Sequence, residues 1–207
     1  MLTASEIAAL IERGEIAWPG ELRGDGLLLR LGSPLQLLAD PGHVIDLANQ
    51  PSIDTLYTQP VHDWDECELA PGQMVLCAAG HPLRLGPAFA AAIAGLSHLA
   101  RVGLSTHVAS PWVMPGWDGH LTFELLNTSH ARLRLRRGMP IARALIWPMY
   151  GVTRPPIPHG HYGCPPTLNL MMAASLTMRT KVDGKAPPVV FRRGFGVRGG
   201  GLVVSLP

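Results

Sequence analysis

Apolar and polar residues alternate most regularly between positions 121 and 126. Every second residue there is large and apolar, namely Leu121, Phe123 and Leu125. This period of two predicts a β-strand with two distinct faces. Glu124 lies in the middle of this strand, where an unpaired carboxylate is costly. It therefore either has a partner or has a chemical role.

Four other stretches have the pattern of strands. Residues 26–32 form an apolar run bounded by glycines, and residues 74–78 follow a Pro-Gly turn. Leucines alternate with arginines over residues 132–136, and residues 141–147 are again apolar. Many short strands joined by glycine and proline turns predict a compact all-β barrel or sandwich.

Two stretches favour helix. Thr3 and Glu6 have the spacing of a capping box, and apolar residues then follow on one helical face as far as Gly14. Residues 87–99 are rich in alanine, and helix propensity alone predicts one long helix there. Because Gly95 interrupts this stretch, we do not favour a single helix.

Two further regions are rich in turns. Residues 39–68 carry several acidic side chains, among them Asp63, Asp65, Glu66 and Glu68, and most simply form a solvated loop. From Gly151 onward, proline-rich stretches alternate with one helix-compatible run at 168–178, and a basic, glycine-rich segment follows. We therefore predict a barrel domain at 1–150 and a C-terminal arm at 151–207.

Composition supports a single domain, with or without an arm. The 207 residues are 47% hydrophobic and only 15% charged, with 20 prolines and 23 glycines, which fits short strands and many turns. A net charge of +2 gives no reason to expect nucleic acid or membrane as a partner. The N-terminal segment, interrupted by Glu6 and Glu12, lacks the pattern of a signal peptide. Three cysteines without framework spacing favour a reduced, cytoplasmic protein.

The strand of Glu124 belongs to a longer set of motifs. G-x-S-x-L-A-R-x-G-L is followed by H-V-x-x-x-W-V-x-P-G-W-x-G and then by L-x-x-E-L-x-N, in register from Gly95 to Asn127. This resembles the dCTP deaminase branch of the dUTPase superfamily, and a looser resemblance covers residues 1 to about 150. The resemblance implies a distorted jelly-roll-like β-barrel that forms a homotrimer, with active sites between subunits. It also splits residues 87–99 into a turn, a strand and a short helix.

The resemblance also implies the chemistry. Hydrolytic deamination of cytosine needs an activated water and a group that carries protons, and one carboxylate can do both. Glu124 matches the general base and acid, and Ser97 and Arg101 match positions that assist it. Ser110 matches a position whose main-chain carbonyl helps to hold the water. The structural alternative is that Glu124 only forms an ion pair, for example with Arg101.

Substrate contacts are implied less uniformly. The positions of Trp112, Met114 and Trp117 in the motif imply that they lie at the substrate site. The family commonly has Asp at the position of Met114, contacting the deoxyribose 3′-hydroxyl, and Arg at the position of Leu96, reaching the phosphate. Each lost charged hydrogen bond weakens binding by about 1.5–3 kcal/mol. Pyrophosphate-releasing relatives depend on that Asp, so Met114 argues against dUTPase activity.

Two other positions are informative. The family usually has Asp where this chain has Leu28. In the arm, Arg193 and Phe195 partly resemble the glycine-rich closing motif of dUTPases, which covers the triphosphate and stacks on the base. Successive glycine amides also suit anion binding. A flexible basic tail is the alternative.

Metal chemistry has little support in the sequence. The H-x-E and P-C-x-x-C signatures of zinc deaminases are absent, so we expect no catalytic metal, and Mg²⁺ only as the companion of a nucleoside triphosphate. His159, His161 and Cys164 offer three ligands without an obvious fourth, and a turn with incidental histidines is the better interpretation.

Three hypotheses follow from the sequence. The first is a zinc-independent dCTP deaminase that releases dUTP and ammonia. The second, favoured by Leu96 and Met114, is a nucleotide-binding or regulatory protein that has lost turnover. The third is a deaminase for another cytosine nucleotide, such as dCMP, in which fewer phosphates need to be bound.

Overall fold

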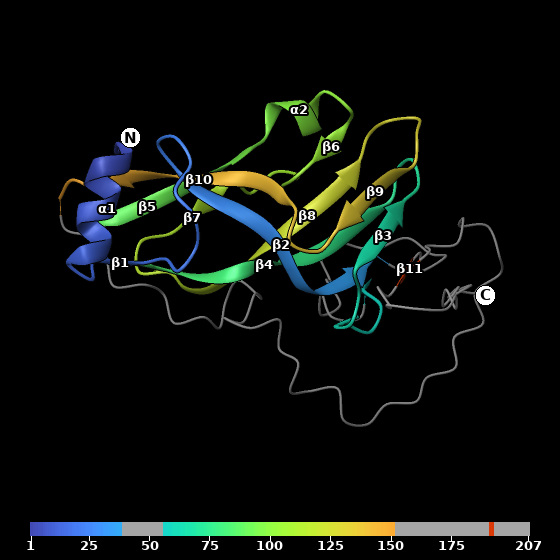
Figure 1. The fold of residues 1–207 in the computed structure, drawn as a ribbon, viewed down its shortest axis with the longest axis horizontal. Helices are drawn as coiled ribbons and strands as arrows, with labels where there is room; N and C mark the ends of the chain where they lie inside the picture. Colours follow the sequence, from blue (N-terminus) through green and yellow to red (C-terminus); the bar gives the residue numbers. More distant parts are fainter. Residues whose placement is uncertain (39–55, 152–190, 193–207) are drawn as a thin grey trace, which may run out of the picture.

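The computed structural model describes residues 1–38, 56–151 and 191–192 (Figure 1). It is built mainly of β-strands, with two short helices, α1 (Ala4–Glu12) and α2 (Ser97–Ala100). The strands are β1 (Ile16–Ala17), β2 (Leu27–Leu37), β3 (Glu66–Leu69), β4 (Met74–Leu85), β5 (Phe89–Gly95), β6 (Leu104–Ser105), β7 (Trp112–Val113), β8 (Asp118–Asn127), β9 (Leu133–Arg136), β10 (Pro140–Pro148) and β11 (Phe191–Arg192). No helix in the described part has the length and apolar composition needed to cross a membrane.

The strands form two antiparallel sheets. The larger has the order β6-β8-β4-β2-β10-β5-β7, and β1 pairs with β4 beside this path. The smaller has the order β11-β3-β9 and lies at the end of the molecule opposite α1 (Figure 1). The large sheet curls around one apolar core, in which Trp64 and Phe123 are the largest fully buried side chains. The predicted β class is confirmed.

Helix α1 begins as the sequence predicts. The backbone amide of Glu6 donates to the hydroxyl of Thr3 at 3.4 Å, and the amide of Thr3 donates to the carboxylate of Glu6 at 2.7 Å. These reciprocal bonds satisfy two amides that a helix start otherwise leaves open. Ile7 and Leu10 are buried on the face turned toward the core. The capping box therefore fixes where the helix starts, and its apolar face fixes how it packs.

The alanine-rich stretch is a strand followed by a short helix. Phe89–Gly95 pairs along its whole length with β10, and α2 begins at Ser97. Gly95 lets Thr106 pack closely against the backbone, because a Cβ there would lie 2.8 Å from the hydroxyl oxygen of Thr106. Long-range pairing with β10 thus overrides the helix propensity of the alanines, as the interruption at Gly95 indicated.

One sequence prediction is wrong. Residues 66–68, expected within a solvated loop, form strand β3 together with Leu69, and this strand pairs with β9. Cys67 and Leu69 are buried, while Glu66 and Glu68 lie on the other face. The acids of β3 are paired rather than only solvated, because Arg136 contacts Glu66 and Arg134 contacts Glu68, each at 2.7 Å. Residues 39–55 of the same expected loop lie outside the described residues.

The C-terminal arm is described only at β11. Phe191 pairs with Cys67 and Arg192 with Glu66, so this part of the arm extends the small sheet at the edge of β3. The helix-compatible run at 168–178 and the metal candidates His159, His161 and Cys164 lie outside the described residues. The division at residue 150 stays a prediction.

Candidate active site

Glu124 is held in place by a backbone amide. It lies on β8 opposite Leu76 of β4, and its neighbours Phe123 and Leu125 are buried in the core. Its own side chain therefore faces the other side of the sheet and is partly exposed. The amide of Val108 donates to Oε2 of Glu124 at 3.1 Å. Among the described residues Glu124 forms no ion pair with Arg101, and its catalytic role stays a prediction.

A cavity of about 330 Å³ opens at Glu124. Its lining combines one carboxylate with small and apolar groups: Tyr57, Met74, Val108, Ala109, Ser110 and Glu124. The structure thus brings together Glu124 and Ser110, two of the predicted catalytic residues. A carboxylate at the wall of a mainly apolar cavity can exchange protons with a bound water or ligand.

Ser97 and Arg101 lie elsewhere on the same chain. Ser97 begins α2 and Arg101 follows its end, and both are exposed. The turn after α2 leads into β6, which pairs with Leu126 and Asn127 at the end of β8. Asn127, the last residue of β8, lies three residues after Glu124, roughly 10 Å along the strand. Because the turn after α2 leads to this end of β8, α2 lies beyond the end of the strand that carries Glu124. Neither residue lines the cavity at Glu124.

The three predicted substrate residues of the hairpin also lie outside this cavity. Trp112 and Met114 flank the buried Val113 on and just after β7 and are 62% and 68% exposed. The ring of Trp112 meets that of Trp147 edge-on at 6.1 Å. The indole of Trp117 donates to the carbonyl of Gly119 at 3.1 Å, which fits a structural part in the turn. Arg193 and Phe195 lie outside the described residues.

Tyr57 and Met74 are lining residues that the sequence did not indicate. Met74 reaches the site because β4 pairs with β8 in a register that sets it opposite Leu126. Tyr57 does so through an isolated bridge to Leu38, whose amide donates to the carbonyl of Met74 at 3.3 Å. Both placements depend on contacts between residues distant in sequence. The sequence held no local signal for either.

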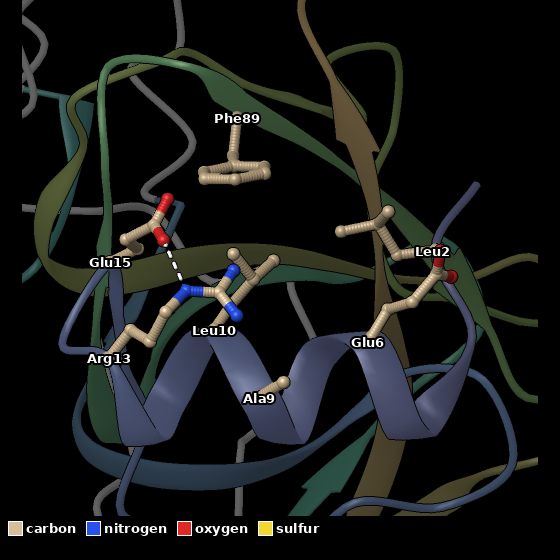
Figure 2. A pocket seen from close by; sticks show the side chains of 7 residues that line it. All are labelled: Leu2, Glu6, Ala9, Leu10, Arg13, Glu15 and Phe89. Carbon is tan, nitrogen blue, oxygen red and sulfur yellow. Dashed lines mark hydrogen bonds and ion pairs between the residues drawn. The ribbon is translucent and has the colours of Figure 1, made fainter.

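A second cavity, of about 310 Å³, lies between α1 and β5 (Figure 2). Leu2, Leu10 and Phe89 supply its apolar walls, and at its rim Arg13 pairs with Glu15 at 2.7 Å. Glu6 also lines it, but hydrogen bonds from Thr3 occupy its carboxylate and lower its pKa from 4.5. None of the predicted site residues lies here, so Glu124 marks the better candidate.

Cysteine and metal chemistry find little support in the described part. Burial raises the pKa of both Cys67 and Cys77 to about 12, so neither is a thiolate nucleophile near neutral pH. Within residues 1–38 and 56–151 no three potential ligands gather to form a metal site.

Comparison with known proteins points to one family. A family model described as dCTP deaminase-like matches residues 1–149. A relative from Nocardioides sp., named dCTP deaminase, dUMP-forming, is 29% identical over 168 residues, or 79% of this chain and 87% of the relative. A relative of the same name from Methanosphaerula palustris is 29% identical over 148 residues, which cover 69% of this chain and 77% of the relative. One from Nanoarchaeum equitans is 33% identical over 98 residues, and the match spans only half of that relative.

A solved structure has the same fold. The crystal structure of 2′-deoxycytidine 5′-triphosphate deaminase from Agrobacterium tumefaciens superposes with a TM-score of 0.54 at 20% identity. The match covers 70% of this chain and 47% of that one. The likeness shows that the two chains share a fold.

Proposed function

Because the chain belongs to the dCTP deaminase-like family, we propose that it is an enzyme that hydrolytically deaminates dCTP, with Glu124 as general base and acid. The observation that carries this proposal is the carboxylate of Glu124, fixed by the Val108 amide at the wall of a 330 Å³ cavity. Two relatives that match most of the chain are named dCTP deaminase, dUMP-forming.

The geometry at Glu124 suits the proton transfers. Oε2 accepts the amide of Val108, while Oε1 has no partner among the described residues. Glu124 takes a proton from water as the water oxygen bonds to C4 of cytosine, and it delivers that proton to N3. It then moves the proton of the new hydroxyl to the amino group, which leaves as ammonia while the C4 carbonyl forms. One carboxylate thus serves as base and then as acid.

Ser97 and Arg101 can complete the site at Glu124 only if they come from a second copy of the chain. Ser97 and Arg101 sit on α2, away from the cavity of their own chain. We therefore propose a homotrimer in which α2 of one copy lies against the Glu124 cavity of its neighbour, where Ser97 and Arg101 assist the reaction. A closed ring of three copies would repeat this contact at each interface. Mg²⁺ enters only with the triphosphate, and a cytoplasmic location stays a prediction.

The product is dUTP in this proposal, although the relatives are named dUMP-forming. Release of pyrophosphate needs a second water activated by a carboxylate or an equivalent base. The resemblance implies an Asp on which pyrophosphate-releasing relatives depend, and this chain has Met114 at that position, whose thioether cannot replace a carboxylate. Deamination therefore ends at the triphosphate.

The first experiment incubates the purified chain with dCTP and Mg²⁺ and measures ammonia and nucleotide products. We expect conversion of dCTP to dUTP, and loss of nearly all activity in Glu124→Gln. Parallel reactions with dCMP and dUTP test the alternatives. Formation of dUMP and pyrophosphate would show that Met114 does not block the second step.

A non-catalytic nucleotide-binding protein is the second candidate, favoured by the apolar residues at positions 96 and 114. It predicts tight binding of dCTP without ammonia release by the wild-type chain. Faster deamination of dCMP than of dCTP would instead support the substrate with fewer phosphates.

A further inference from the structure

The cavity beside helix α1 takes no part in the proposed chemistry. It measures about 310 Å³ and lies between α1 and the start of β5 (Figure 2). Phe89 and Leu10 are buried and Leu2 and Ala9 are half-buried, so its walls are mainly apolar. Covering apolar surface of this kind stabilises a complex in proportion to the area removed from water. The cavity is therefore suited to an apolar occupant.

Charged side chains stand at the rim of this cavity. The lining includes the two carboxylates of Glu6 and Glu15 and the single guanidinium of Arg13, which together give a net charge of −1. Nε of Arg13 donates to Oε1 of Glu15 at 2.7 Å, and Thr3 donates to Oε2 of Glu6. Among the described residues, the other oxygen of each carboxylate accepts no hydrogen bond. The rim can therefore receive a cation next to an apolar occupant.

The chain leaves the barrel next to the same cavity. Pro148, the last residue of β10, pairs with Phe89, and the amide of Met149 donates to the carbonyl of Ala88 at 2.8 Å. Gly151 then has a φ of +100°, a conformation that glycine adopts readily and that lets the chain change direction. The residues that follow Gly151 thus start close to the wall that Phe89 forms.

The sequence that follows has the chemistry of a suitable occupant. Residues 152–158, which lie outside the described residues, read V-T-R-P-P-I-P and carry one arginine and no acid, a charge of +1. Prolines favour the polyproline II conformation, in which residues three apart share a face, as Pro155 and Pro158 would. Such segments bind apolar grooves with aromatic walls at a small cost in conformational entropy. Charge and shape therefore both match the cavity.

The distance to be covered also matches. Pro155 follows Pro148 by seven residues, which in polyproline II span at most about 22 Å. Helix α1 has nine residues, and at 1.5 Å per residue it is about 14 Å long. The proline segment can therefore reach the cavity anywhere along α1.

We propose that residues 152–158 lie in the cavity beside α1 of their own chain, with the prolines against Phe89 and with Arg154 beside Glu15. The arm is then attached to the barrel at two places, because β11 pairs with β3 at the end of the molecule opposite α1 (Figure 1). Residues 159–190 connect the two attachments. This inference concerns the arm and does not depend on the proposed function.

Disulfide trapping in the full chain tests the contact. Cys164→Ser leaves only Cys67 and Cys77 of the native cysteines, and both are buried. Ala9→Cys then places a thiol in the cavity wall, and Ile157→Cys places one in the segment without removing a proline. A disulfide forms only where the two Cα atoms approach to about 4.4–6.8 Å. The rate of bond formation in oxidised glutathione, followed by peptide mapping, therefore reports how often the segment lies in the cavity.

The matched control moves the first thiol by one residue. Ala8 does not line the cavity and is turned by about 100° around the helix from Ala9. A freely moving segment would meet a thiol at either position at a similar effective concentration, so we expect a rate roughly 10-fold higher for Ala9→Cys than for Ala8→Cys only if the segment is held in the cavity. Thermal unfolding verifies that both chains fold.

Variants of the segment test what holds it. Adding Pro155→Ala and Pro158→Ala to the Ala9→Cys and Ile157→Cys chain should slow bond formation about 10-fold, because the segment loses its preformed shape and apolar contacts. Pro187→Ala and Pro188→Ala, farther along the arm, are the matched control and should leave the rate unchanged. Arg154→Glu should also slow it, since it places a carboxylate beside the acidic rim.

Each contrary result would overturn the proposal. Equal rates for the cysteines at positions 8 and 9, or an unchanged rate after loss of both prolines, would mean that the segment does not occupy the cavity. Bonds that join two chains, seen as dimers on non-reducing gels, would assign the cavity to the segment of a second copy.

Discussion

The single described hydrogen bond to Glu124 comes from a backbone donor, the amide of Val108, rather than from a side chain. A backbone donor does not depend on the identity of its side chain, but it does depend on the path of the chain between β6 and β7. That path also supplies Ala109 and Ser110 to the cavity wall. At the scale of single residues, the site is therefore set by main-chain geometry as much as by residue type.

Val108→Pro removes this donor and keeps an apolar side chain. A hydrogen bond to a charged group contributes about 1.5–3 kcal/mol, so we expect kcat to fall roughly 10- to 100-fold. Val108→Ala retains the amide and is the control, with at most a small effect. Steady-state assays with dCTP measure both variants, and unchanged circular dichroism verifies the fold. Full activity in Val108→Pro would mean that Glu124 is positioned by other groups.

At the scale of elements, the helices and strands that carry local signals form where the sequence predicts them. The capping box at Thr3 starts α1, and the alternation around Glu124 marks β8. Strand β3 was missed, because its acids resemble a solvated segment until β9 supplies arginines opposite them. Its second face, with Cys67 and Leu69, becomes buried only through contacts from elsewhere in the chain.

Thr3→Ala tests the capping box. Loss of an N-cap side chain typically costs about 1 kcal/mol, so we expect Thr3→Ala to lower the free energy of unfolding by about that amount. Chemical denaturation at pH 7 measures this difference. Glu6 has a folded-state pKa lowered from 4.5 by its bonds to Thr3, so its contribution is present above pH 4.5 and is lost as the pH falls through the folded pKa.

The difference between wild type and Thr3→Ala should accordingly shrink below pH 4.5. Glu12→Ala, in the last turn of α1 and outside the box, is the control and should show no such narrowing. A difference that stays constant with pH would exclude the bond to ionised Glu6 as its source.

At the scale of the whole molecule, the predicted catalytic residues divide into two groups. Glu124 and Ser110 share a cavity, whereas Ser97 and Arg101 lie on and after α2. If all four act together, they must come from two copies of the chain. The proposed trimer is therefore needed to complete the active site as well as to describe the assembly of the chains.

Mixing two inactive variants tests this arrangement. Glu124→Gln and Arg101→Gln are refolded together at equal amounts, so that hybrid trimers form. About a quarter of the interfaces then combine an intact Glu124 from one copy with an intact Arg101 from its neighbour. We expect deamination of dCTP to recover to about that fraction of wild type. Absence of recovery in verified hybrids would place all four residues in one chain.

The sequence by itself determined the features that depend on local order. It identified the β class, the start of α1, the break at Gly95 and the strand that turns Glu124 away from the core. The motif from Gly95 to Asn127 also indicated the family, which the match over residues 1–149 confirmed. These features follow from side-chain periodicity and backbone preferences, which act over a few residues.

Only the tertiary structure decided how distant segments meet. It paired β3 with β9, brought Tyr57 and Met74 to Glu124, and separated Ser97 from that cavity. Strand register and order arise from the packing of the whole core, because a strand's own pattern specifies which face is buried but not which strand lies next to it.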